Sequence, residues 1–318
     1  MFLSIFGTLI ASGLFFQGQG SEGLVVCAGG KELFIMEAGG LTGAPFRKIW
    51  SWSAEGSKQI QPDQVRKFAN LDECKPVDGG KGILFCASNS GCGLIEYPSG
   101  KLVWSALVAN AHSVEMLPGG RVAAASSLGG NQLLLFDIKG NSPGEPVWKT
   151  PLHSAHGIVW DSRRESLWAL GFDEVRQYKL SDWPTSKPKL NLEKVHRLPS
   201  DGGHDLRPVP GTSDLLVTNH AGIFLFDRDS GRFRPHPVAG PLSKVKSIDV
   251  DEASGRVVYS TWGKKIELLS PSKTMPTSEN IVYKARWFPG ASSLKQETGK
   301  QGHEMPQRKY QDAPSFEG

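Results

Sequence analysis

Three segments of the chain share one pattern: Ala-His-Ser-Val-Glu-Met-Leu at residues 111–117, Ala-His-Gly-Ile-Val-Trp-Asp at 155–161 and Gly-His-Asp-Leu-Arg-Pro-Val at 203–209. Their histidines, His112, His156 and His204, are 44 and 48 residues apart, and each opens a short strand-like run. A repeat of this length that holds several strands is typical of one blade of a β-propeller. If the repeats are blades, equivalent positions meet at one axis, and three imidazoles distant in the chain converge there.

The residues around these segments follow a common order of elements. A first strand ends in a tight turn, as at Asp78-Gly-Gly and Pro118-Gly-Gly, and an apolar second strand and a third strand ending in Phe-Asp or a similar pair follow. Six units result, near residues 24–54, 64–107, 111–152, 153–198, 199–240 and 242–288. Because the runs are short, β-rich and evenly spaced, we predict an all-β chain: a single β-propeller of four-stranded, WD40-like blades, six in number, with seven as the alternative.

The first unit lacks an innermost strand in this arrangement. The last apolar run, residues 282–287, is assigned as the outer strand of the sixth unit. Propellers commonly close by combining strands from both termini in one blade, which removes an open sheet edge. The sequence therefore leaves the mode of closure open.

Composition fits a soluble globular protein that is rich in turns. The chain has 318 residues, of which 39% are hydrophobic and 21% charged, with 37 Gly, 21 Pro and nine Trp. The formal net charge is +4, and it is spread along the chain without a Lys/Arg cluster. Because binding to a phosphate backbone requires a concentrated basic patch, we do not expect nucleic acid as a partner.

The first residues predict an exported protein. Residues 2–16 are almost entirely apolar and uncharged, a length that suits the core of a signal peptide better than a membrane span, although no basic residue precedes Lys31. We predict a signal peptide at 1–20, a propeller domain at 21–289 and a disordered or loosely attached tail at 290–318. The expected location is secreted or periplasmic, with no membrane span after cleavage; the alternative for residues 2–16 is a buried first strand.

Four cysteines, Cys27, Cys74, Cys86 and Cys92, all fall in the first third of the chain. They contain no Cys-x-x-Cys pair, which argues against a zinc site. Export would permit one or two disulfides, and buried structural thiols are the other expectation.

The motifs as a set resemble a known family. Ala-His-Ser-Val-Glu, His-Gly-Ile-Val-Trp-Asp, His-Asp-Leu and Val-Lys-Ser-Ile-Asp between residues 111 and 260, with Tyr283-Lys-Ala-Arg-Trp, resemble a bacterial secreted β-propeller family of unknown function. The resemblance implies the fold and no reaction. The histidine pattern alone is distantly similar to propeller polysaccharide lyases such as oligogalacturonate lyases, which hold a divalent metal with histidines from separate blades and cleave uronic-acid glycans by β-elimination.

Alignment of the units on their turns adds Asp72 and Lys246 to the histidine positions, so the predicted ring is Asp72, His112, His156, His204 and Lys246. The loops that follow the second strands lie on the same face of a propeller and contribute Asn89, Asn131, Asp173, Asn219, His220, Trp262 and Lys264. Amides match sugar hydroxyls, tryptophan stacks on a pyranose, and cations hold a carboxylate. We assign these loop residues, with Asp72 and Arg207, to substrate binding.

Three kinds of chemistry fit the ring. His112, His156 and His204 could bind a divalent metal (Mn, Ca or Zn) that acts as a Lewis acid. One histidine could instead serve as general acid or base without metal, with Lys246 or Arg207 neutralising developing charge. In the third, the imidazoles only hydrogen-bond backbone groups. We predict a monomeric carbohydrate-active lyase or hydrolase that acts on an acidic glycan fragment, with His112, His156, His204 and Lys246 catalytic; the alternative is a non-catalytic propeller that binds a glycan or a protein.

Overall fold

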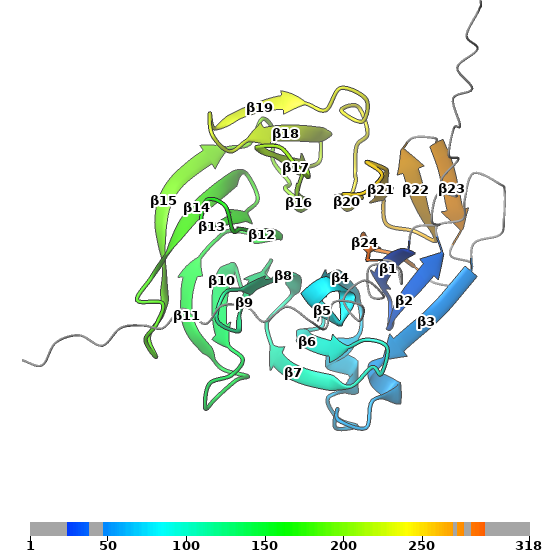
Figure 1. Ribbon diagram of the computed structural model, residues 1–318, viewed down its shortest axis with the longest axis vertical. Helices are drawn as coiled ribbons and strands as arrows, with labels where there is room; N and C mark the ends of the chain where they lie inside the picture. Colours follow the sequence, from blue (N-terminus) through cyan, green and yellow to red (C-terminus); the bar gives the residue numbers. More distant parts are fainter. Residues whose placement is uncertain (1–23, 38–46, 270–271, 277–280, 290–318) are drawn as a thin grey trace, which may run out of the picture.

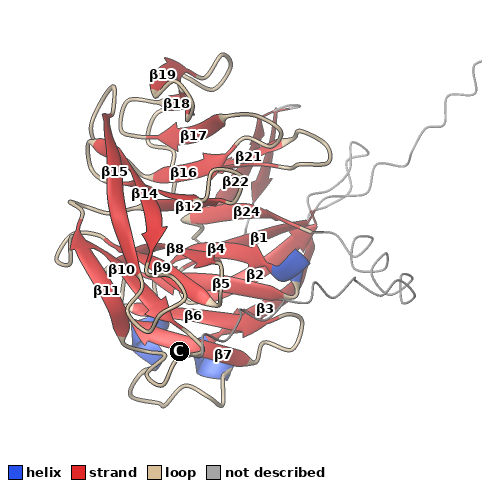
Figure 2. Cartoon of the chain, turned by 60° about the vertical axis from the view of Figure 1, so that its left-hand side comes forward, coloured by secondary structure: helices blue, strands red, loops and turns tan. Residues whose placement is uncertain are grey.

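The computed structural model describes residues 24–37, 47–269, 272–276 and 281–289, and these residues form six antiparallel sheets of four strands. The sheets stand around a central axis as the blades of a propeller (Figure 1), and an oblique view shows that strands and connecting loops make up nearly all of the described chain (Figure 2). The prediction of a six-bladed all-β propeller is confirmed. The predicted signal peptide and the predicted tail lie outside the described residues.

The blades each run in chain order from the innermost to the outermost strand, except that the first blade begins with the last strand of the described chain. They are β24 (Lys284–Phe288), β1 (Leu24–Gly29), β2 (Glu32–Glu37) and β3 (Arg47–Ser53); β4 (Leu71–Val77), β5 (Gly82–Ala87), β6 (Gly91–Glu96) and β7 (Leu102–Leu107); β8 (Ala111–Leu117), β9 (Arg121–Ser126), β10 (Gln132–Asp137) and β11 (Pro146–Pro151); β12 (Gly157–Asp161), β13 (Ser166–Leu170), β14 (Glu174–Ser181) and β15 (Lys189–Arg197); β16 (Asp205–Pro208), β17 (Asp214–Thr218), β18 (Ile223–Asp227) and β19 (Arg232–Pro235); and β20 (Ser247–Val250), β21 (Val257–Ser260), β22 (Lys265–Leu269) and β23 (Ser272–Pro276). Three short 3-10 helices, η1 (Ala54–Gly56), η2 (Val65–Phe68) and η3 (Asp78–Gly80), lie between these strands.

The ring closes through the first blade. β24 pairs antiparallel with β1, with Lys284 opposite Ala28 and Phe288 opposite Leu24, so the last strand supplies the innermost position that the first unit lacks. The assignment of residues 282–287 to the outer edge of the sixth unit is therefore wrong, because β23 fills that position. Strands from both ends of the described chain thus share one sheet, which has four strands like the other five.

Apolar side chains fill each of the six spaces between neighbouring blades. Every residue of β5 and β9 is buried, because both faces of these second strands are covered by adjacent blades. That explains why their sequences are nearly continuous apolar runs and do not alternate with polar residues. Phe85 and Phe136 are fully buried, and each such side chain contributes roughly 2–3 kcal/mol to stability.

All four cysteines are buried free thiols. Cys86 and Cys92 stand directly opposite each other on β5 and β6, and the Sγ of Cys74 donates hydrogen bonds to the carbonyl oxygens of Val26 and Lys284. The thiols thus belong to the packing between blades. Among the described residues, no helix has the length and apolar character needed to cross a membrane.

Candidate functional site at the propeller axis

Six side chains, one from each blade, stand where the innermost strands begin. They form what we call the axial ring: Asp72 (β4), His112 (β8), His156 (before β12), His204 (before β16), Lys246 (before β20) and Tyr283 (before β24). The backbone shows that the positions are equivalent. The N–H groups of His156, His204, Lys246 and Tyr283 each donate to a carbonyl of the adjacent second strand, those of Leu170, Thr218, Ser260 and Ala28, at 2.8–2.9 Å.

Asp72 and His112 reach the ring through irregular pairing of their strands. The register of β4 with β5 shifts between Leu71 and Glu73, and that of β8 with β9 shifts between Ala111 and Ser113. The residue inside each shift is bulged, and a bulge redirects a side chain. Tyr283 is the ring member that the sequence analysis missed, because its segment was assigned to an outer strand.

The histidines form a continuous row. The ring centroids of His112 and His156 are 4.4 Å apart, those of His156 and His204 are 5.5 Å apart, and His220 stands 5.1 Å from His204. The Nζ of Lys246 lies 2.9 Å from the Nε2 of His204. The structure therefore brings the three predicted ring histidines and Lys246 together, and it places the predicted loop residue His220 beside His204.

Hydrogen bonds define which imidazole nitrogens carry protons. Nδ1 of His112 lies 3.1 Å from the carbonyl oxygen of Asn110, and Nδ1 of His156 lies 2.7 Å from that of Ser154. A carbonyl only accepts, so each Nδ1 must be the donor, and Nε2 of a neutral ring then keeps its lone pair. Within the described residues neither Nε2 has a hydrogen-bond partner, so the two rings present two unfilled acceptors.

His204 has the same tautomer for a different reason. Its Nε2 accepts a hydrogen bond from the Lys246 ammonium, so its Nδ1 carries the proton, and this buried Nδ1 has no partner among the described residues. A buried donor without a partner is costly, which makes it a feature that needs a physical explanation. Binding of an acceptor near this edge of the ring would remove that cost.

Burial keeps the imidazoles neutral. Desolvation lowers the pKa of His112 to about 4 and that of His204 to about 3, and it moves the pKa of His156 well below its usual value. The positive charges of Lys246 and Lys284 act in the same direction on His112 and His204. Burial also lowers the pKa of Lys246. The ring is thus a desolvated region of positive potential with neutral imidazoles at neutral pH.

Below the ring, eight charged side chains fill the axis: Glu73, Glu115, Asp205 and Asp249 with Lys75, Arg207, Lys284 and Arg286. We call this set the axial charge network. Arg286 contacts Glu73 at 2.9 Å and Asp205 at 2.7 Å, and Lys284 contacts the same two carboxylates at 3.3 and 3.2 Å. The four negative and four positive charges cancel, so the layer of side chains beneath the axial ring is electrically neutral and held by hydrogen bonds.

Arg207, predicted to bind substrate, belongs to the axial charge network. Its Nε donates to Asp249 at 2.9 Å, and it lies on β16 beyond the network residue Asp205. The structure therefore separates Arg207 from the ring. Lys284 connects the axial charge network to the axial ring, because its Nζ also donates to the backbone oxygen of His112 at 3.0 Å.

The predicted loop asparagines mainly hold their own loops. Nδ2 of Asn89 donates to the carbonyl of Arg66, and its Oδ1 accepts from Asn70. Oδ1 of Asn131 accepts the N–H of Ser154 at 2.8 Å, which fixes the segment that carries His156. These amides position neighbouring segments of the ring.

Asn219 is fully buried and its amide is saturated. Oδ1 accepts the N–H groups of Ala221 and Gly222 at 2.9 and 3.0 Å, and Nδ2 donates to the carbonyl of Ser200 at 3.0 Å. The asparagine shapes the loop that holds His220 over His204 and has no free polar atom for a ligand.

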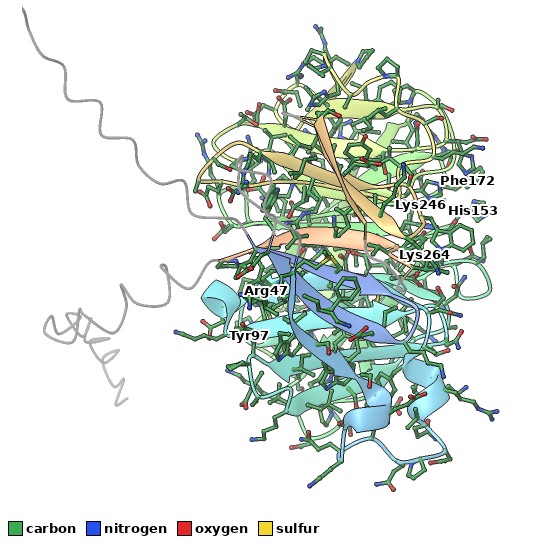
Figure 3. All side chains as sticks on the ribbon, turned by 90° about the vertical axis from the view of Figure 1, so that its right-hand side faces the viewer. Arg47, Tyr97, His153, Phe172, Lys246 and Lys264 are labelled. Carbon is green, nitrogen blue, oxygen red and sulfur yellow. The ribbon has the colours of Figure 1, made fainter. Side chains whose placement is uncertain are left out.

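Lys264, another predicted loop residue, lies on the face of the disc that carries the axial ring, which we call the ring face (Figure 3). In the edge-on view, Lys246, His153, Phe172 and Lys264 share one face of the disc, and Arg47 and Tyr97 lie on the other (Figure 3). Phe172 packs between His153 and His220, with centroid distances of 5.3 and 6.4 Å, so it extends the imidazole row outward.

Asp173 and Trp262 are on this side of the blades but do not join the row. Asp173 is engaged by Arg197 at 2.6 Å in an exposed ion pair. Trp262 is 65% exposed, with its indole free to act as a stacking surface. Within the described part of the chain, neither residue makes a ring contact or an ion pair with a member of the axial ring.

The arrangement bears on the expected divalent metal. Among the described residues, no group of three or more His, Cys, Asp and Glu side chains is placed to hold a metal ion. A metal bound by all three Nε2 atoms would require Lys246 to leave His204, whose lone pair it occupies. The residues as arranged thus do not fit a three-histidine metal site, and metal binding stays a prediction.

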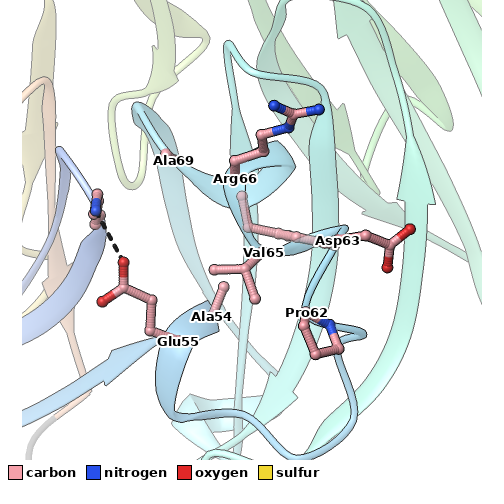
Figure 4. A pocket seen from close by; sticks show the side chains of 9 residues that line it. Ala54, Glu55, Pro62, Asp63, Val65, Arg66 and Ala69 are labelled. Atoms are coloured by element: carbon pink, nitrogen blue, oxygen red, sulfur yellow. Dashed lines mark hydrogen bonds and ion pairs between the residues drawn. The ribbon is translucent and has the colours of Figure 1, made fainter.

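A separate pocket of about 390 Å³ lies at the edge of the ring face, between the first and second blades (Figure 4). Apolar atoms of Ala54, Val65 and Phe68 form part of its wall, and Lys31 and Glu55 at its rim form an exposed ion pair of 2.9 Å. These two rim charges are exposed and pair with each other, whereas the histidines of the axial ring are buried and their pKa values are lowered. We therefore place the candidate chemistry at the ring.

A comparison with known families identifies the family to which the chain belongs. The model of a family of unknown function, DUF6528, matches residues 42–251, which is more than half of the chain. No curated protein matches the chain. Membership of a family of unknown function is confirmed by this match and the propeller fold by the structure, whereas secretion and similarity to lyases stay predictions. The chain is a six-bladed β-propeller and belongs to the DUF6528 family.

Proposed function

We propose that the axial ring binds an acidic sugar through its carboxylate and hydroxyl groups, and that the protein acts on such oligosaccharides as a lyase or hydrolase. One observation carries this proposal. The two unfilled Nε2 acceptors of His112 and His156 lie in the same row as the Lys246 ammonium. Sugar hydroxyls donate to neutral imidazoles, and an ammonium binds a carboxylate, so the set complements a hydroxyl-bearing anion.

The electrostatics support an anionic ligand. Desolvation is the main cause of the lowered pKa values of His112 and His204, and the positive charges of Lys246 and Lys284 lower them further. The contribution of the two lysines indicates a positive local potential. The same potential stabilises a bound carboxylate, and desolvation strengthens that attraction. His220 and Phe172 extend the surface outward, and an aromatic ring offers a face on which a sugar can pack.

The chain's own residues supply acid–base chemistry for this ligand. A neutral imidazole can accept a proton from the carbon next to the sugar carboxylate, and Lys246 can stabilise the negative charge that develops on that carboxylate. Each such contribution is worth roughly 10²–10⁴ in rate. A divalent metal, if one binds, would supply Lewis-acid polarisation of the same carboxylate.

The test is a panel of oligogalacturonate, oligoglucuronate and alginate fragments, with neutral oligogalactose as the control ligand. Calorimetry measures binding, and ultraviolet absorbance and reducing-end assays detect unsaturated and hydrolysed products. We expect acidic oligomers to bind at least about tenfold more tightly than the neutral one, and Lys246→Met to remove that preference. Lys149→Met, on the exposed edge of β11, is the matched control.

Equal binding of acidic and neutral sugars, or an unaffected Lys246→Met variant, would overturn the proposal. Acid-selective binding without any product supports the non-catalytic alternative, a glycan-binding propeller. A metal content that rises with activity, and falls in His156→Gln, would support the metal-dependent form of the enzyme.

A further inference from the structure

One member of the axial ring is a carboxyl group that no cation neutralises. Asp72 is 4% exposed and sits in the bulge of β4. Within the described chain it forms no ion pair, and its hydrogen bonds come from Ser88 in the β5–β6 loop, including one from the Ser88 hydroxyl to Oδ2. This contrasts with Glu73, the next residue, which has two cationic partners.

The surroundings of Asp72 disfavour its charged form. The titratable groups that act on it are Glu73 on its own strand, Cys86 on β5, Tyr283 just before β24 and Lys284 on β24. His112 on β8 packs against Tyr283. Of these only Lys284 is cationic, and that ammonium contacts Glu73, Asp205 and the His112 carbonyl instead.

The balance of these effects leaves Asp72 about half protonated at pH 7. Desolvation raises the pKa of Asp72 to about 7, against the opposing effects of the Ser88 hydrogen bonds and the charge of Lys284. The imidazoles of the same ring have pKa values shifted the other way. When the environment of one site shifts the pKa values of two kinds of titratable group in opposite directions, the two groups commonly act as a separate acid and base.

The ring geometry separates these roles in space. Asp72 is in the second blade and His204 in the fifth, so in a six-membered ring they stand on opposite sides of the axis. A ligand held at Lys246 and His204 by its carboxylate would extend its far side toward Asp72.

We propose that Asp72 is the proton donor of the axial ring, a catalytic residue that hydrogen-bonds an oxygen of the bound sugar, with Ser88 as its positioning residue. This rests on the proposed function. In an elimination, a neutral imidazole takes the proton from the carbon beside the sugar carboxylate and a carbon–carbon double bond forms. The carbon–oxygen bond to the departing sugar breaks, and the proton of Asp72 goes to that oxygen. Proton exchange with water then restores both groups.

The first test needs no ligand. Carbonyl-labelled aspartate gives a carbon-13 titration of every Asp side chain, and Asp72→Asn identifies the signal of Asp72. We expect a midpoint near 7 that Ser88→Ala shifts upward, because the serine hydrogen bonds favour the carboxylate. Asp182→Asn, an exposed residue paired with Lys189, is the matched control. A midpoint below about 5 would overturn the role of Asp72, whatever the protein binds.

The second test uses trigalacturonate in calorimetry at pH 7, in two buffers with different ionisation enthalpies. A bound anion raises the pKa of Asp72, so binding should take up roughly half a proton in the wild type and none in Asp72→Asn. Binding without uptake, or uptake that persists in Asp72→Asn, overturns the role of Asp72 and leaves the proposed function intact. Absence of binding by the wild type overturns the proposed function and the role together.

Discussion

Replacement of Glu73 by glutamine should strongly destabilise the propeller. Glu73 is fully buried, and its carboxylate is shared by Arg286, Lys284 and the hydroxyl of Ser113 at 2.9–3.3 Å. Glutamine keeps the shape but leaves two fully buried cations with Asp205 as their remaining carboxylate. Removal of one partner from a buried ion pair costs about 3–5 kcal/mol, because the other charge stays desolvated.

Guanidinium titration of Glu73→Gln and wild type, followed by tryptophan fluorescence, measures this loss. Glu55→Gln is the matched control, since the Lys31–Glu55 pair has the same chemistry but side chains that are 70% and 59% exposed. Such exposed pairs contribute at most about 1 kcal/mol. Equal stability of Glu73→Gln and Glu55→Gln would contradict the idea that the axial charge network supports the ring.

Three further predictions concern the ring itself. The folded pKa values of His112 (about 4) and His204 (about 3) are below the unfolded value of about 6.5, so the unfolded chain binds protons first. The contribution of these two imidazoles to stability should be complete above about pH 6.5 and fall toward pH 4, by up to about 1.4 kcal/mol per pH unit for each imidazole. The raised pKa of Asp72 acts in the opposite direction, so the measurement is made in Asp72→Asn, where a plateau over that range in acid denaturation would contradict this. Lys246→Met should raise the pKa of His204 in a proton NMR titration, because it removes a neighbouring positive charge; an unchanged value would refute the 2.9 Å contact. Gly202→Ala should displace His220, because the new Cβ would lie 2.2 Å from its Nδ1 and Gly202 has φ +73, and a crystal structure with an unmoved imidazole would count against that packing.

The periodic features of the fold could be predicted from sequence, because each blade repeats the same local pattern. Alternating and apolar runs marked the second and third strands, and tight-turn residues marked their limits. Closure could not be predicted in the same way, since β24 pairs with β1 from the other end of the described chain. The charged pattern of Lys284 and Arg286, which parallels Glu73 and Lys75 on β4, is the signal that could have marked β24 as an innermost strand.

The sequence predicted which residues stand near the axis, but it did not predict their hydrogen bonds or protonation. Equivalent positions in the repeats bring His112, His156, His204 and Lys246 together, as expected of a radial fold. Which nitrogen carries a proton depends on backbone carbonyls and on local bulges that leave no mark in the sequence. For the same reason Asn219 looked available for a ligand although turn N–H groups saturate it.

Histidine side-chain nitrogen-15 NMR at pH 7, recorded with and without saturating trigalacturonate, tests most directly whether the axial ring binds an acidic sugar. Acceptance of hydroxyl hydrogen bonds should shift the Nε2 resonances of His112 and His156, and Lys246→Met should abolish the shifts while Lys149→Met leaves them in place. Unchanged Nε2 resonances of both histidines, under conditions where calorimetry shows the sugar bound, would place the ligand elsewhere and contradict an axial site.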